Sequence, residues 1–225
     1  MTALLTIENL PDLNETITVP EDIFEELTAQ DASVAGFNPY EQPTVRDLLY
    51  GVLLPSGADA CETLARAVGG SEEGFVAMMN QKAEELGLTN THFENCTGLH
   101  NDNHYSTCRD IAVLMSECLK SDTFREIVTR EVYTTEATAS HPEGITLYDT
   151  MLHRFTSYEM STTLENGAVI EGGKTGFTDE AGQCLVSFAE YGGEEYILVT
   201  AEAMTDSGSA VDSIADASTV YGRLQ

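Results

Sequence analysis

The sequence is poor in positive charge. It has 10 lysines and arginines against 38 aspartates and glutamates in 225 residues, so its formal net charge is −28. Only three of the basic residues are lysines, at Lys82, Lys120 and Lys174. A surface this negative repels the phosphates of nucleic acids and of anionic membranes. The composition therefore excludes a nucleic-acid partner, and its plainest use is solubility.

Several other features are also missing. No run of about 18 apolar residues occurs, and the N-terminus has neither a basic region nor a cleavage-site pattern, so the sequence predicts no membrane span and contains no export signal. The five cysteines stand singly, with no C-x-x-C pair. We interpret them as buried free thiols rather than as metal or redox ligands. They are Cys61, Cys96, Cys108, Cys118 and Cys184.

His100 and His104 are four residues apart, a spacing that can bind a metal on a helix. Here they lie in a polar segment typical of a loop, and the sequence offers no third ligand beside them. A structural hydrogen-bonding role for His104 is the simpler interpretation. We expect no metal and no cofactor.

Hydrophobic residues make up 42% of the chain, which is enough for a real core. Helical patterns dominate the first half and alternating patterns the second, so we expect an α+β fold in which an antiparallel sheet packs against a helical cluster. The predicted helices are 1–8, 44–54, 56–69, 71–86, 106–120 and 211–221. The predicted strands are 16–19, 131–135, 145–149, a segment around Lys174, 183–191 and 195–201.

The most informative stretch is 172–182, GGKTGFTDEAG, because it places a rare lysine among small residues between two predicted strands. One interpretation is a phosphate-binding loop, G-x-x-x-x-G-K-[ST]. That motif requires a glycine where the chain has Ala168, and a helix where an alternating strand follows. The second interpretation is the Lys-Thr-Gly strand of penicillin-recognising serine enzymes. The strand context favours this second interpretation.

Five segments together resemble the serine D-Ala-D-Ala carboxypeptidases, the low-molecular-weight penicillin-binding proteins of peptidase family S11. They are LLPSGADA at 53–60, GSEEGFVAMMN at 70–80, NTHF at 90–93, GL at 98–99 with HYST at 104–107, and KTGFT at 174–178 with AG at 181–182. Each is weak alone, but their shared order and spacing cover essentially the whole chain. The resemblance implies a β-lactamase/transpeptidase-like fold and hydrolysis of peptidoglycan peptides that end in D-Ala-D-Ala, through an acyl-serine.

The resemblance also implies roles for particular residues. Ser56 matches the serine of the family's Ser-x-Asn motif, which relays protons near the leaving group, and Lys174 matches the lysine of Lys-Thr-Gly. Lys174, Thr175, Gly176 and Phe177 would bind the substrate, with Lys174 on its terminal carboxylate. The family binds β-lactams and acts outside the cytoplasmic membrane, so we expect both of the full-length protein.

The sequence departs from the family in two places. The family's nucleophile motif, Ser-x-x-Lys, is absent, because Met79, Glu117 and Glu171 stand three residues before the three lysines. In the family this motif directly precedes a stretch like residues 1–5. We therefore expect 1–225 to be a partial catalytic domain, inactive alone, whose first strands, nucleophile and signal peptide are encoded upstream. The second departure is Ala58, where the family has a substrate-binding asparagine.

Three alternatives remain at this point. Ser56 follows Pro55 and could serve only as a helix N-cap. The chain could belong to a non-catalytic relative whose cleft binds peptide or nothing. A class A β-lactamase shares the three motifs, but the sequence shows no deacylating glutamate loop of that class.

Overall fold

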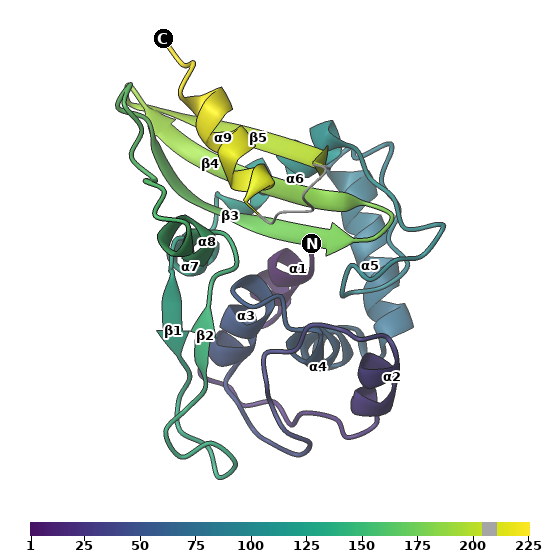
Figure 1. Ribbon diagram of the computed structural model, residues 1–225. Coiled ribbons are helices and arrows are strands. Elements are labelled where there is room, and N and C mark those ends of the chain that lie inside the picture. The colour runs from purple at the N-terminus through teal and green to yellow at the C-terminus, as the bar shows by residue number, and fades with distance from the viewer. Residues whose placement is uncertain (204–210) are drawn as a thin grey trace.

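The computed structural model describes residues 1–203 and 211–225, and its elements form a sheet region above a helical region (Figure 1). The helices are α1 (Thr2–Asn9), α2 (Ile23–Ala29), α3 (Val45–Leu53), α4 (Ala58–Gly69), α5 (Glu72–Glu85), α6 (Cys108–Cys118), α7 (Asp122–Val128), α8 (Leu152–Ser157) and α9 (Asp212–Tyr221). The strands are β1 (Val132–Thr134), β2 (Thr146–Tyr148), β3 (Val169–Thr178), β4 (Gly182–Tyr191) and β5 (Glu194–Ala203). The predicted α+β class is therefore correct.

The main sheet is an antiparallel meander with the order β3-β4-β5. A tight turn at Gly192 and Gly193 joins β4 to β5, and both glycines have the positive φ that such turns require, 64° and 85°. Helix α9 lies across one face of the sheet, and α6 packs against the other (Figure 1). The predicted strands 131–135 and 145–149 both exist, but they pair with each other as a separate two-stranded ribbon, β1-β2.

The helices begin where side chains satisfy the free backbone N–H groups of the first turn. Thr44 and Asp47 form the predicted capping box at the start of α3. The Ser71 hydroxyl accepts the Gly74 N–H at the start of α5. Helix α4 ends at Gly69, and its C-cap Gly70 takes the left-handed conformation with φ 76°. These capping signals explain why most predicted helix boundaries agree with the structure.

Two apolar clusters hold the molecule together. The larger joins α1 and α3 to α7 and reaches the sheet at Phe188. The smaller fills the space between α8, the sheet and α9, around the fully buried Met151 and Phe155. Tyr50 of α3 and Tyr133 of β1 stack with ring centroids 3.6 Å apart, which fastens the ribbon to the helical cluster.

Some short elements were not predicted correctly from the sequence. The predicted strand 16–19 is only a single bridge between Thr16 and Thr44, and the expected connection 20–43 contains α2. Helices α7 and α8 were not predicted, because segments of seven and six residues span too few turns to show a period. Among the helices of residues 1–203 and 211–225, none has the length and apolarity that a membrane span requires.

Strand β5 is a sheet edge, and no strand of the described residues pairs with its outer side. We expect the chain to self-associate through this edge despite its charge, because unpaired N–H and C=O groups recruit other strands. Tyr196→Lys should weaken the association by placing a charge on the edge. Sedimentation velocity over a concentration series measures it, with the similarly exposed Tyr158→Lys as control. A monomer at every concentration would contradict this prediction.

Candidate functional site

Ser56 and Lys174, which lie 118 positions apart in the sequence, meet in the structure. The Lys174 ammonium donates to the Ser56 hydroxyl at 2.8 Å and to the Thr175 carbonyl oxygen at 2.9 Å. An ammonium has three N–H donors, so among the described residues these two bonds leave one donor for a ligand. The structure thus brings together the two residues that the sequence selected.

The N-cap interpretation of Ser56 is wrong. Helix α4 begins at Ala58, its N-cap is Gly57, and no side chain caps it. Ser56 instead has a left-handed backbone with φ 64°, which is uncommon for a residue with a side chain. Such strain concentrates at functional sites, where the surrounding structure enforces it. Here the bend aims the Ser56 hydroxyl at Lys174.

Asp59 fixes the backbone beside Ser56, a role that the sequence did not reveal. Its carboxylate is fully buried and accepts the N–H groups of Ala35 at 2.7 Å, Gly36 at 2.9 Å, Phe37 at 3.0 Å and Ala60 at 3.0 Å. Segment 35–37 thereby lies against the Ser56 loop. In the first turn of α4, the Ala58 N–H donates to the Ser33 carbonyl oxygen at 2.8 Å, just before segment 35–37.

The glycines before Lys174 are required by packing. A Cβ at Gly173 would lie 2.4 Å from the Val186 carbonyl oxygen, and one at Gly172 would lie 2.4 Å from the Val128 carbonyl oxygen. Both distances are too short for any side chain. Gly176 is different, since a Cβ there would meet only an ordinary contact at 3.7 Å.

Thr175 and Phe177 complete the set of residues predicted to bind substrate. The Thr175 hydroxyl shares a hydrogen bond of 2.6 Å with that of Thr150. Phe177 is 60% exposed, so its ring is available to a ligand rather than part of the core. Ala58, which stands in the position of the family's asparagine, is buried at the start of α4 and offers no hydrogen bond from its side chain.

Two ionisable groups near this site have displaced pKa values. Burial lowers the pKa of Lys174 from 10.5 to about 8, although the negative charge of Asp149 opposes the shift. Burial raises the pKa of Asp149 from 3.8 to about 7, against the opposing effects of two backbone N–H groups and of Lys174. The Lys174 ammonium is therefore still mostly charged at neutral pH, when it can bind an anion.

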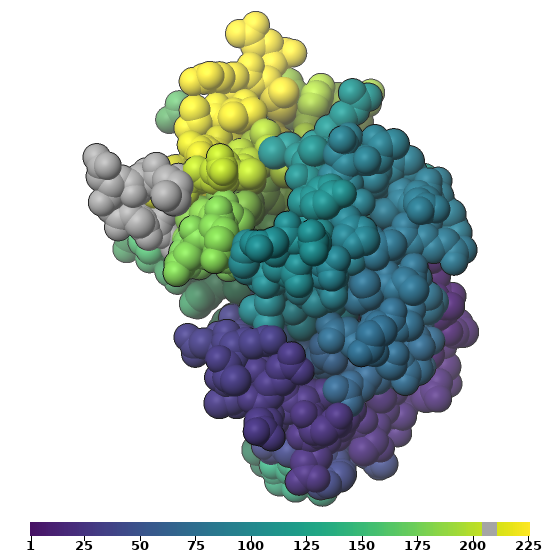
Figure 2. All heavy atoms as spheres, turned by 90° about the vertical axis from the view of Figure 1, so that its right-hand side faces the viewer, coloured from purple at the N-terminus to yellow at the C-terminus, as the bar shows by residue number. Residues whose placement is uncertain are grey.

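Two hollows adjoin the site. Ser56 and Lys174 line a cavity of about 320 Å³ together with Met1 and Thr2 at the start of α1. A larger cleft of about 730 Å³ lies between the α2 region, the loop around His100 and the end of β3. Figure 2 shows this cleft as a notch between the green end of β3 and the purple α2 segment.

His100 and His104 have separate partners among the described residues. His104 accepts the Glu94 N–H at 3.4 Å and packs edge-on against Phe93, so its structural interpretation is confirmed. His100 lies near the carboxylates of Asp102, at 3.4 Å, and Glu180, at 3.7 Å.

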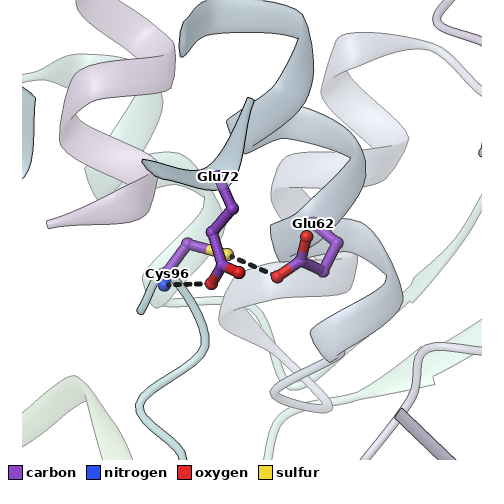
Figure 3. A group of neighbouring side chains, drawn as sticks. All are labelled: Glu62, Glu72 and Cys96. Carbon is purple, nitrogen blue, oxygen red and sulfur yellow. Dashed lines mark hydrogen bonds between the residues drawn. The ribbon is translucent and has the colours of Figure 1, made fainter. Parts of the chain in front are cut away.

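A different group of potential ligands was not noticed in the sequence. Glu62, Glu72 and Cys96 place one ligand atom each within 4.8 Å of one another (Figure 3). Their polar atoms already have partners, since the Cys96 thiol donates to Glu62 at 3.3 Å and the Cys96 N–H donates to Glu72 at 3.1 Å. Arg66 also lies 3.5 Å from Glu62. We therefore interpret the group as a polar contact between α4, α5 and the loop after them.

The cysteine prediction is confirmed in part. All five cysteines are free, and Cys61, Cys96 and Cys118 are buried as expected. Cys108 is exposed and Cys184 is partly exposed.

Glu62 should make the protein less stable as the pH rises. Burial and the neighbouring charge of Glu72 raise its pKa from 4.5 to about 7. The folded state then binds a proton that the unfolded chain has lost, so the free energy of unfolding falls between about pH 4.5 and pH 7. Glu62→Gln should remove about 1 to 3 kcal/mol of this fall. Urea unfolding at pH 5 and pH 7.5 tests it, with the exposed Glu84→Gln as control; equal losses in both variants would contradict it.

Comparison with known proteins identifies the family. The sequence model of peptidase S11, D-alanyl-D-alanine carboxypeptidase, matches residues 1–205. The D-alanyl-D-alanine carboxypeptidase DacF of Bacillus subtilis is 34% identical over 206 residues, which are 91% of this chain and 50% of that protein. The D-alanyl-D-alanine carboxypeptidase of Streptomyces sp. strain K15 is 36% identical over 192 residues, 83% of this chain and 64% of that protein.

Comparison with solved structures gives the same family. The crystal structure of the Streptomyces K15 DD-transpeptidase superposes with a TM-score of 0.78 at 30% identity, covering 98% of this chain and 85% of that one. The D-alanyl-D-alanine carboxypeptidase of Mycobacterium tuberculosis gives a TM-score of 0.77 at 26% identity, with 98% and 78% covered. The predicted transpeptidase-like fold is thus confirmed.

The chain spans about half to two thirds of the curated relatives named above. Within that span the family match, the fold and the meeting of Ser56 with Lys174 agree with one another. The chain therefore belongs to the D-alanyl-D-alanine carboxypeptidase family, peptidase S11.

Proposed function

We propose that residues 1–225 form a partial catalytic domain of a serine D-Ala-D-Ala carboxypeptidase, in which Ser56 and the Lys174 strand bind the substrate opposite a Ser-x-x-Lys nucleophile. The observation that supports this most is one cavity lined by Met1, Ser56 and Lys174. A Ser-x-x-Lys segment joined ahead of Met1 would end at the wall of this cavity. The family's three motifs would then surround one cleft.

The geometry supports a division of roles. Lys174 is the cation of the cleft, and its remaining N–H would hold the carboxylate of a terminal D-alanine, beside the Thr175 hydroxyl. The nucleophilic serine would attack the D-Ala-D-Ala carbonyl carbon after passing its proton to the neighbouring lysine of its own motif. Ser56, hydrogen-bonded to Lys174, would give its proton to the leaving amine and take in its place the proton held by the lysine of Ser-x-x-Lys. Water would then hydrolyse the acyl-serine.

This proposal includes the substrate and its location. Peptidoglycan stem peptides that end in D-Ala-D-Ala would be the substrates, and β-lactams would acylate the complete site. The protein would then work outside the cytoplasmic membrane, in the cell envelope or secreted. The strongly negative surface agrees with a role that needs no nucleic acid.

A gain-of-activity experiment tests the proposal. Residues 1–225 alone should not be acylated by a fluorescent penicillin, because Ser56 has no Ser-x-x-Lys base beside it. A chimera that joins the family's preceding strands and Ser-x-x-Lys segment to Met1, hereafter the complemented chain, should be acylated and should release D-alanine from a peptide ending in D-Ala-D-Ala. Intact-mass analysis and a D-alanine assay measure both results.

The matched control is the complemented chain with the serine of Ser-x-x-Lys changed to alanine, which should show neither reaction. A penicillin adduct on Ser56 of residues 1–225 would contradict the assigned roles. A folded complemented chain that releases no D-alanine would favour the non-catalytic alternative.

A further inference from the structure

Three consecutive residues after β2 interact with three consecutive residues of β3, hereafter the motif strand. The Met151 sulfur fills the space beside Gly173, where an added Cβ would lie 2.8 Å from it. The charge of Asp149 acts on Lys174, and the Thr150 hydroxyl bonds that of Thr175 at 2.6 Å. We call residues 149–151 the corner, because the chain turns there from β2 into α8.

Thr150 is bonded to both sides of the site. Its hydroxyl pairs with Thr175 on the motif strand, and its backbone N–H donates to the Leu54 carbonyl oxygen at 3.2 Å. Leu54 is two residues before Ser56. Thr150 therefore links the motif strand to the loop that carries Ser56.

Asp149 is almost fully buried, with 1% of its surface exposed. One carboxylate oxygen accepts the N–H groups of Met151 at 2.9 Å and Leu152 at 2.6 Å at the start of α8. The other oxygen is buried and has no hydrogen-bond partner among the described residues. A helix cap needs only the first oxygen, so the cap does not explain why the second is kept in the interior.

Nearby positive charge favours a carboxylate at this buried position. Among the described residues, Lys174 and Arg154 are the cations that act on Asp149, and Asp149, Cys61 and Arg154 act on Lys174. Of these, Arg154 opposes a charge on Lys174, and the Cys61 thiol is neutral because burial raises its pKa to about 12. Asp149 is thus the buried anion that favours the Lys174 ammonium.

We propose that the corner positions the carboxylate-binding group of this site: Thr150 holds the Thr175 hydroxyl, and Asp149 keeps Lys174 charged while the cleft excludes water. The inference deepens the proposed function and rests on it for the identity of the ligand. A threonine hydroxyl has one proton, and its direction is set by its neighbours. When the Thr150 hydroxyl donates to that of Thr175, the single Thr175 proton is left to donate to a bound carboxylate.

The role of Asp149 is tested on residues 1–225 without any assay of activity. Asp149→Asn keeps an oxygen for the Met151 and Leu152 N–H groups and removes the charge by replacing the second oxygen with a neutral NH2 group. The three lysines give three side-chain NMR signals, and Lys174→Arg assigns that of Lys174. In Asp149→Asn the Lys174 titration midpoint should move to lower pH by about one unit. Lys82 and Lys120 serve as internal controls, and an unmoved Lys174 midpoint would overturn this part.

The role of Thr150 is tested in the complemented chain. Thr150→Val removes the hydroxyl at nearly constant volume and should raise KM for a D-Ala-D-Ala peptide about three- to tenfold while kcat changes by less than about twofold. Thr150→Ser keeps the hydroxyl and should restore KM. An unchanged KM in Thr150→Val, or a Thr150→Ser variant as impaired as Thr150→Val, would overturn the assignment.

The pH dependence separates positioning from mere structural support. Asp149→Asn in the complemented chain should match the parent near pH 6, where Asp149 is already mostly protonated, and should lose kcat/KM as the pH rises above about 7. A loss of equal size at every pH would assign Asp149 to folding alone. If the complemented chain without substitutions releases no D-alanine, the proposed function fails. The lysine titration still decides whether Asp149 stabilises the charge of Lys174.

Discussion

Lys174→Ala in the complemented chain should lower kcat/KM for a D-Ala-D-Ala peptide by about ten- to a hundredfold or more. The Lys174 ammonium donates a hydrogen bond to Ser56. In the proposed complex its contact with the substrate carboxylate would be charge-assisted. Such a bond contributes about 1.5 to 3 kcal/mol, and each 1.4 kcal/mol corresponds to a factor of about ten in rate. Steady-state release of D-alanine measures the effect.

Two further expected results make this prediction specific. Lys174→Arg should recover only part of the loss, because a planar guanidinium does not fit between the Ser56 hydroxyl and the Thr175 carbonyl as a compact ammonium does. The parent should also lose kcat/KM above about pH 8, where the buried amine gives up its proton, and Lys174→Ala should lack this decline. Release of D-alanine at the parental rate by Lys174→Ala would remove the basis for the carboxypeptidase proposal.

The sequence revealed this site because its chemistry lies in residues that are rare in the chain. Lys174 is one of three lysines, and Gly173 and Gly176 bracket it in a strand. Composition and local pattern were sufficient to select it. The same is true of the helix starts at Thr44 and Ser71, where the side chain that caps the helix lies within a few residues of the N–H that it accepts.

The rest of the site depends on contacts between distant segments. Thr150 meets Thr175 across 25 positions, and Asp59 accepts N–H groups 22 to 24 positions away. Nothing in the local pattern around Asp59 or Thr150 distinguishes it from an ordinary polar residue. The interpretation of Ser56 as an N-cap was wrong for the same reason, since its true hydrogen-bond partner lies 118 positions along the chain. Long-range hydrogen bonds of this kind have no period that a sequence can show.

The second large effect is expected at Asp59, where Asp59→Ala should lower the free energy of unfolding by about 3 to 5 kcal/mol. The substitution leaves the N–H groups of Ala35, Gly36 and Phe37 without their acceptor, and the Asp59 carboxylate that served them is fully buried. An unsatisfied buried donor costs about 1 to 3 kcal/mol. Two or three such groups are therefore a large fraction of the 5 to 15 kcal/mol that typically stabilises a domain.

Urea unfolding of residues 1–225 measures this loss, and two variants make the result interpretable. Asp59→Asn keeps one acceptor oxygen, so it should be intermediate and should remain folded if Asp59→Ala does not. Asp102→Ala removes a carboxylate whose side chain is 97% exposed, and it should change stability by less than about 0.5 kcal/mol. Because Asp59 also fixes segment 35–37 against the Ser56 loop, Asp59→Asn should impair acylation of the complemented chain even where it is fully folded. Equal stability of Asp59→Ala and Asp102→Ala would show that segment 35–37 does not depend on this carboxylate.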